Sequence, residues 1–427
     1  MRTRAELFRY AGLDVQGTIL TGHYELDGRQ FSERVSFEGV GDLGPAARAV
    51  AELWYVIAGL SYYKAGAARR VELGSTRLGP KGRTLLHAAL RDGLGEFAYR
   101  NDLDLDDVVI AGGVEVERYS PALDPNRVLT PFGGGIDSVV TVTRLNERLE
   151  QSLFIVSPSA GRFHSLEATA TVTGLPVVRA SRTLDEQVLH GDPTFYNGHV
   201  PVTAMVTLLA ALAAVASGRG GVVMSNEHSA SVPNLYWRDR PVNHQWSKSL
   251  DAEVLIGDAL GELVGDGLVV ASFLRDRSEL WVAEAFASEG DYHRVFRSCN
   301  RAFAQDNAQR AASWCGECDK CLFIDLVLAP FLARERLREI FGGEPLAERA
   351  REAQLRTLVG LGEQHKPFEC VGDPDESAVA LRAVSALAEW RDAPQLAEIA
   401  ARTSPERTFD ELLRPQGPRR VPAHWLR

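Results

Sequence analysis

The sequence predicts an α/β fold built on a doubly wound parallel sheet, with an α+β region before it and a helical region after it. In the middle of the 427-residue chain, short apolar runs alternate with helical stretches. The clearest examples are a strand, glycine loop and helix over 127–149, and a helix over 201–217 followed by a strand over 221–225. Strands that alternate with helices in this way are typical of parallel sheets.

Residues 1–125 form the first predicted region, of α+β type. A strand-like alternation at 17–20 precedes a helix that begins near Pro45 and has apolar residues at helical spacing. A second helix is expected over 84–99. Two prolines, Pro121 and Pro125, indicate a linker before the next region.

Residues 126–321 form the predicted α/β domain. Its four strands are expected at 127–131, 152–156, 175–179 and 221–225. Ligands of such sheets bind at the carboxyl ends of the strands. The glycine loop after the first strand and Asn226-Glu227-His228 after the fourth strand both fall there. Residues 322–427 are expected to be mainly helical, with a loosely held tail over the last dozen residues.

Composition and charge exclude some classes of function. Apolar residues make up 45% of the chain, enough for a real core, and the net charge of −10 argues against a nonspecific nucleic-acid binder. The N-terminus has no apolar segment typical of a signal peptide. The most apolar stretch, 200–216, is too short and too weak for a membrane span. We therefore predict a cytoplasmic protein with no membrane partner, and the sequence is silent on oligomeric state.

Four of the five cysteines are clustered, and their spacing predicts a metal site. Two-residue gaps let neighbouring thiolates converge on one ion, and four thiolates complete a tetrahedral zinc shell. No position is then left for water, so we expect a structural zinc; an iron–sulfur cluster is the alternative. The expected ligands are Cys299, Cys315, Cys318 and Cys321.

A run of three glycines predicts an anion-binding loop. The residues Gly133, Gly134 and Gly135 let the backbone approach a ligand closely, and the next helix presents free N–H groups to an anion. Asp137 and Ser138 are expected to cap this helix, and Ser138 can donate to a phosphate. An ordinary glycine turn is the plain alternative. No Gly-Lys-Ser/Thr follows, which excludes a Walker loop.

With its flanks, the loop resembles the SGGxDS fingerprint of the PP-loop ATP pyrophosphatases. Gly133 stands where that family has its first serine. The resemblance implies a HUP-like fold and an enzyme that cleaves ATP between the α- and β-phosphates. Ser298-Cys299-Asn300 and the CGECDKC run of 315–321 also resemble the zinc knuckle of 7-cyano-7-deazaguanine synthase, a member of the same superfamily.

Longer segments resemble the UDP-N-acetylmuramoyl-L-alanyl-L-glutamate epimerases, the MurL family. They are the segments 59–64, 225–230, 242–249 and 365–370. The resemblance implies inversion of the terminal L-glutamate of UDP-MurNAc-L-Ala-L-Glu to D-glutamate, with ATP and Mg²⁺, through an acyl-adenylate. AMP and pyrophosphate are the implied products, and peptidoglycan precursor synthesis is the implied process. Adenylation neutralises the α-carboxylate, which makes the α-proton easier to remove.

Five residues are candidates for the chemistry. Lys248 is expected to bind phosphate or carboxylate, with a solvated surface lysine as the alternative. Glu227 and His228 could ligate Mg²⁺ or act as a base, or could cap a helix. Cys370 is the one cysteine outside the metal cluster, and either it or Glu369 is a candidate base. The plain alternative for Cys370 is a small buried apolar side chain.

Other functions compete with the epimerase. One is another PP-loop adenylating enzyme, either an amide- or nitrile-forming ligase of the 7-cyano-7-deazaguanine synthase type or a tRNA-modifying enzyme. The acidic net charge disfavours tRNA. A non-enzymatic, zinc-stabilised binding module is the remaining alternative, because Gly133 departs from the expected serine.

Overall fold

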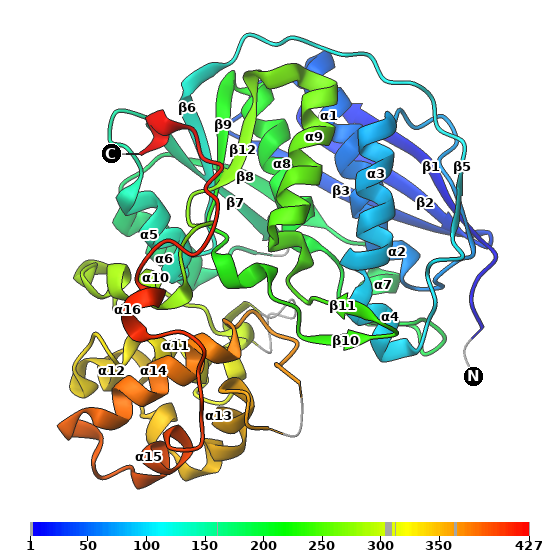
Figure 1. Cartoon of the computed structure of the whole chain (residues 1–427). Coiled ribbons are helices and arrows are strands. Elements are labelled where there is room, and N and C mark those ends of the chain that lie inside the picture. Colours follow the sequence, from blue (N-terminus) through cyan, green and yellow to red (C-terminus); the bar gives the residue numbers. More distant parts are fainter. Residues whose placement is uncertain (1–2, 160, 304–309, 312, 363–364, 427) are drawn as a thin grey trace.

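A ten-stranded mixed sheet forms the centre of the molecule (Figure 1). The computed structural model describes residues 3–159, 161–303, 310–311, 313–362 and 365–426. The strands lie in the order β12-β9-β6-β7-β8-β3-β2-β1-β4-β5. Their bounds are β1 (Leu7–Gln16), β2 (Ile19–Leu26), β3 (Arg29–Glu38), β4 (Arg70–Glu72), β5 (Val109–Ala111), β6 (Asp124–Pro131), β7 (Glu150–Pro158), β8 (Val177–Thr183), β9 (Arg219–Met224) and β12 (Val269–Ser272).

The strands β12, β9, β6, β7 and β8 are all parallel. Numbered by their own order along the chain, they run 5-4-1-2-3, which is the doubly wound order with its switch point between β6 and β9. This part of the sheet confirms the predicted parallel architecture. The whole sheet is mixed, because β3 pairs with β8 in antiparallel register, Phe37 opposite Ala180, and so joins the N-terminal strands to the same sheet.

Helices cover both faces of the sheet, as its buried side chains require. Leu129 and Val222 belong to the core beneath α1 (Pro45–Ala58), α3 (Pro80–Ala88), α8 (Val202–Ala216) and α9 (Leu250–Val264). Their chain neighbours Val128 and Val223 belong to the opposite core, with α5 (Ile136–Arg144), α6 (His164–Thr173) and α10 (Glu279–Ala287). Successive strand residues point to opposite faces, so both must be apolar.

The predicted helix over 84–99 is wrong in one respect, because the structure breaks it into three pieces. The helix α3 ends at Ala88, a π-helical turn covers 89–93, and α4 spans Gly95–Asn101. A Cβ on Gly93 would lie 2.9 Å from the Trp246 ring, so only glycine allows this close packing. π-turns are frequent at functional sites, and this one precedes Glu96.

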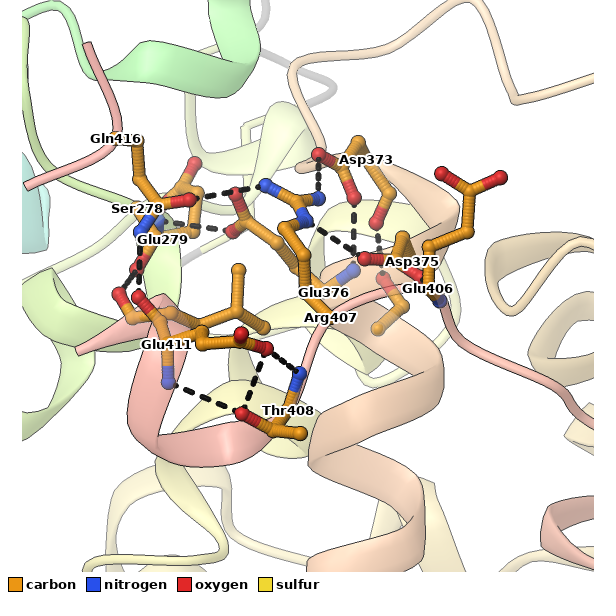
Figure 2. A network of polar contacts seen from close by, with 12 residues as sticks. Ser278, Glu279, Asp373, Asp375, Glu376, Glu406, Arg407, Thr408, Glu411 and Gln416 are labelled. Carbon is orange, nitrogen blue, oxygen red and sulfur yellow. Dashed lines mark hydrogen bonds and ion pairs between the residues drawn. The ribbon is translucent and has the colours of Figure 1, made fainter. Parts of the chain in front are cut away.

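The C-terminal part is helical, as predicted, and groups below the sheet in Figure 1. A network of polar contacts ties the starts of α10 and of α14 (Pro374–Ala386) to the start of α16 (Phe409–Leu412) and to Gln416 in the tail (Figure 2). The last residues are not loose: Trp425 is 1% exposed, and the Asn146 N–H donates to its carbonyl at 3.1 Å. The helices are α11 (Asp319–Leu328), α12 (Arg334–Phe341), α13 (Glu352–Leu358), α14 (Pro374–Ala386), α15 (Pro394–Ala400) and α16 (Phe409–Leu412).

Candidate active site

The site lies at the switch point of the parallel strands. The glycine loop follows β6 and the segment with Glu227 follows β9, so both leave the sheet at its carboxyl edge. Adjacent strands whose connections run in opposite directions open a crevice at this edge. Because β6 and β9 are neighbours in the sheet, the two segments that follow them lie close together.

Two of the three loop glycines are required by their surroundings. Gly134 has a φ of +72°, and a Cβ there would lie 3.2 Å from Leu166. A Cβ on Gly135 would lie 2.5 Å from the Ser298 hydroxyl. The Arg297 N–H also donates to the Gly134 carbonyl at 3.1 Å, so the loop packs on the segment that leads to Cys299. Gly133 is different, since a Cβ there would meet nothing within 4 Å.

The expected capping of α5 by Asp137 and Ser138 is wrong. Gly135 is the N-cap residue and no side chain caps the helix. The Ser138 hydroxyl instead donates back to the Gly135 carbonyl at 3.0 Å. Asp137 Oδ1 has no hydrogen-bond partner among the described residues, and burial raises the pKa of this carboxyl to about 6. A buried carboxylate oxygen without a partner is costly, which indicates a place for a cationic ligand.

Lys248 and Cys370 lie beside Asp137. Lys248 is the last residue of a short 3-10 helix over Trp246–Lys248, and its charge acts on both Asp137 and Cys370. Burial raises the pKa of the Cys370 thiol, but the Lys248 charge and a hydrogen bond from His244 outweigh it and lower the pKa to about 5. This lowered pKa favours the thiolate, which is the reactive form.

Of the other predicted residues, Glu227 belongs to the same cluster, because its charge acts on both Asp137 and Lys248. Glu227 is 4% exposed and its Oε2 caps the short helix His228–Ser231, accepting from the Ala230 N–H at 2.9 Å. His228 packs toward Gly417 of the tail rather than toward Cys370. Burial raises the pKa of Glu369, whose polar neighbours are Asn300 and the Lys320 backbone. Of the pair at 369–370, only Cys370 joins the cluster around Lys248.

Several charged residues of the site were missed by sequence reasoning. Glu279 and Lys320 are buried and their charged groups lie 3.9 Å apart, while Lys366 is 7% exposed and its Nζ has no partner among the described residues. Glu96 and His244 were missed too. Glu96 Oε2 lies 2.5 Å from His244 Nδ1. A lone glutamate in a polar helix carries no signal that distinguishes it from a solvated residue.

The four clustered cysteines converge, as their spacing predicts. Their sulfur atoms all lie within 4.8 Å of one another, with 3.5 Å between Cys318 and Cys321 and 3.7 Å between Cys315 and Cys321. Four thiolates bound tetrahedrally to one zinc would be about 3.8 Å apart. In an iron–sulfur cluster the four thiolates are divided among two or four irons, which holds at least some of the sulfurs further apart. The geometry could hold one zinc ion.

The fold is α/β, and its candidate active site, at the switch point of the parallel strands, combines a glycine loop with a cysteine that lies among cationic side chains. The chain belongs to the MurL family of epimerases and is accordingly an isomerase. The model of the MurL N-terminal domain matches residues 1–273, and that of the MurL C-terminal domain matches residues 295–412. The first match ends one residue after β12, the last strand of the sheet.

Relatives agree with the family models. A protein of Salinispora tropica named UDP-N-acetyl-alpha-D-muramoyl-L-alanyl-L-glutamate epimerase is 43% identical over 351 residues, which cover 81% of this chain and 75% of that protein. A protein of Xanthomonas oryzae pv. oryzae with the same name is 35% identical, over 90% of this chain and 87% of its own length. No solved structure matches the chain. Among the described helices, none combines the length and apolar character needed to cross a membrane.

Proposed function

We propose that the enzyme inverts the terminal L-glutamate of UDP-MurNAc-L-Ala-L-Glu to D-glutamate for peptidoglycan precursor synthesis. Relatives at 35–43% identity carry the name of this epimerase. The observation that carries the proposal is the placement of Cys370 beside Lys248 and Asp137, at the edge of the sheet where the glycine loop lies. Inversion at a carbon acid needs a base, and a stabilised thiolate is one.

We further propose that ATP is the second substrate and that the glycine loop binds its phosphates. ATP would supply an adenylyl group to the α-carboxylate, releasing pyrophosphate and leaving an acyl-adenylate. The space beside Gly133 is open, since a Cβ there would meet nothing within 4 Å, so a ligand can approach the loop backbone at this position. The helix α5 begins at the loop and directs its positive end toward it. Asp137 Oδ1 fits Mg²⁺, because it is an unpartnered carboxylate oxygen. Lys248 is placed to neutralise phosphate or carboxylate charge.

The proton transfer is assigned to Cys370. Its thiolate takes the α-proton, forming an S–H bond, while the electron pair of the C–H bond passes to the adenylated carbonyl as an enolate. A proton from an acid or water on the opposite face then re-forms the C–H bond with D configuration. The thiol proton returns to solvent, and water cleaves the acyl-adenylate to the free carboxylate and AMP, so protons balance over the cycle.

We propose that the four-cysteine site holds a structural zinc. All four ligand positions of a tetrahedral ion are taken by thiolates, which leaves no place for a reactive water. The site ties the loop to the C-terminal helices, because Ser298 packs on Gly135 and Cys321 lies in the first turn of α11. Elemental analysis should find one zinc per chain; iron with inorganic sulfide would contradict the assignment.

The function is tested by incubating the purified enzyme with UDP-MurNAc-L-Ala-L-Glu and Mg-ATP. The glutamate is released by acid hydrolysis and resolved by chiral chromatography, and pyrophosphate is measured in the same samples. We expect D-glutamate and pyrophosphate to appear together. Pyrophosphate release without inversion, stimulated by ammonia or tRNA, would instead show an adenylating ligase or a tRNA-modifying enzyme.

A further inference from the structure

Three segments far apart in the sequence meet at His244. Glu96 lies in α4, His244 precedes the 3-10 helix Trp246–Lys248, and Cys370 ends the segment 365–370. His244 Nδ1 lies 2.5 Å from Glu96 Oε2, and Arg100 Nε donates to Glu96 Oε1 at 2.6 Å. Both oxygens of this buried carboxylate are therefore engaged, and the orientation of the His244 ring is fixed.

Side-chain contacts to the backbone hold the Cys370 segment against His244. The Asn234 side-chain amide donates to the Pro367 carbonyl at 2.7 Å, while its Oδ1 accepts from the backbone N–H of His244 at 2.8 Å. Gln245 donates to the Val371 carbonyl at 3.1 Å. These contacts lie on both sides of Cys370 along the chain. These contacts to the backbone therefore fix the position of the Cys370 thiol relative to the His244 imidazole.

A ring contact adds a third attachment. The Phe368 ring lies 5.7 Å from the Tyr99 ring, and the Arg100 guanidinium lies 4.9 Å from the Phe368 centroid. Tyr99 and Arg100 belong to α4, the helix that carries Glu96. The same helix therefore positions both the carboxylate and the segment of the thiol.

Charges around the thiol and the imidazole match a thiolate–imidazolium pair. Lys248, His244 and Lys320 act on Cys370 from the positive side, and Asp137 and Glu369 are its acidic neighbours. Burial lowers the pKa of His244, but hydrogen bonds with Cys370 and Glu96 raise it to about 9. The ring of His199 lies 4.1 Å from that of His244, and burial and the His244 charge lower its pKa to about 3, so it stays neutral.

We propose that Glu96 and His244 are positioning residues that hold Cys370 as a thiolate, with the His244 imidazolium donating to Sγ and the Glu96 carboxylate fixing the imidazolium. The inference rests on the proposed function and gives the proton-accepting thiolate its physical basis. When Cys370 takes the α-proton, His244 keeps its own proton and Glu96 keeps its charge. The two side chains therefore set the fraction of reactive thiolate without bonding to the substrate carbon.

The arrangement has one competing interpretation. Ligand atoms of Glu96, His199 and His244 lie within 4.8 Å of one another, a spacing that a metal ion could also use. Both Glu96 oxygens are already bonded to Arg100 and His244, and His244 is hydrogen bonded to Cys370 as well as to Glu96. Because the Glu96 oxygens and the His244 ring already have hydrogen-bond partners, hydrogen bonding from Glu96 through His244 to Cys370 is favoured over metal binding.

The experiment measures the rate at which iodoacetamide alkylates Cys370 as a function of pH, without substrate. Mass spectrometry of the peptide that contains Cys370 separates it from the four clustered cysteines. Wild-type protein should show a midpoint near pH 5, the pKa of the thiol. His244→Gln should raise the midpoint by more than one pH unit, and Glu96→Gln should raise it by a smaller amount.

His23→Gln is the matched control, because His23 in β2 also pairs with a carboxylate, Asp14 at 3.1 Å, and its side chain is largely exposed. It should leave the midpoint unchanged. If His244→Gln fails to fold, Glu96→Gln decides the question. An unchanged midpoint in the folded variants would overturn the inference, as would a second metal ion per chain that His244→Gln removes. Since no substrate is present, the result does not depend on whether the enzyme makes D-glutamate.

Discussion

Two clusters of charged side chains meet near Glu279, and they differ in how completely their charges are paired. In the cluster of Figure 2, Arg407 contacts Asp373 and Asp375 at 2.7 Å each and Gln416 at 3.2 Å. In the active-site cluster, by contrast, Asp137 Oδ1, Glu279 Oε2 and Lys366 Nζ have no partner among the described residues. We expect the first cluster to stabilise the C-terminal fold and the unpaired charged groups of the second cluster to bind ligands.

The difference teaches how this chain separates stability from function. Paired buried charges hold elements together, and removing one partner leaves the other uncompensated. Unpaired buried charges cost free energy until a ligand satisfies them, so their removal should stabilise the protein while reducing activity. Glu376 belongs to both clusters, since its Oε2 accepts the Glu279 N–H at 2.9 Å and its Oε1 has no partner among the described residues.

Among the variants considered, Asp137→Asn in the active-site cluster should have the largest effect on activity. Pyrophosphate release should fall by roughly 100-fold or more, because charge stabilisation at the phosphates is lost. The same variant should be more stable at neutral pH by on the order of 1 kcal/mol. Asp266→Asn, on an exposed turn, is the control for both measurements.

The raised pKa of Asp137 predicts how its effect on the free energy of unfolding depends on pH. Burial raises its pKa from 3.8 to about 6, so between these values the folded protein binds more protons than the unfolded chain. Wild-type stability therefore falls as pH rises through this window, and the loss is complete above pH 6. The gain of Asp137→Asn in urea denaturation should be full above pH 6 and should vanish below pH 4. A gain independent of pH would contradict the assignment.

Arg407→Met should break the paired cluster and lower stability by about 2 kcal/mol, since Asp373 would be left buried without its cation. The midpoint of urea unfolding, followed by tryptophan fluorescence, measures the loss. Arg336→Met removes an exposed ion pair with Glu339, 2.6 Å long, and should cost less than about 0.5 kcal/mol. Equal losses in the two variants would show that pairing in the cluster of Figure 2 contributes nothing special.

Gly133→Ser should have the smallest effect. A Cβ at Gly133 meets nothing within 4 Å, so activity should change by no more than about twofold. Gly134→Ser is the contrasting variant, because its φ of +72° and the nearby Leu166 make any side chain strained. If Gly133→Ser abolished pyrophosphate release as Gly134→Ser does, the loop would be tighter than its geometry indicates.

The parts of the fold that depend on local sequence could be predicted. The helix predicted over 201–217 corresponds to α8, which spans Val202–Ala216, and the strand, loop and helix at the glycine loop are confirmed. Apolar periodicity and the positions of glycines are local signals, so both features can be predicted. The joining of β3 to β8 could not be predicted, since pairing between distant strands leaves no local pattern. The break before Glu96 depends on the packing of Gly93 against Trp246, another distant contact.

The candidate active site likewise has features that depend on local sequence and features that depend on distant contacts. The convergence of the four cysteines follows from their spacing, whereas the approach of Cys370 to His244 depends on Asn234 and Gln245 holding two remote segments together. Glu96 lies 148 residues from its partner His244. Only the folded chain brings these groups together, so the sequence predicts Cys370 and Lys248 as site residues but does not predict Glu96 and His244.

The most direct test of the account compares two products of the Cys370→Ala variant. With UDP-MurNAc-L-Ala-L-Glu and Mg-ATP, pyrophosphate release should persist, because the glycine loop, Asp137 and Lys248 are intact. D-Glutamate formation should fall by roughly 100-fold or more, the usual loss when a positioned base is removed. D-Glutamate formed at the wild-type rate by Cys370→Ala would contradict the assignment of Cys370 as the base.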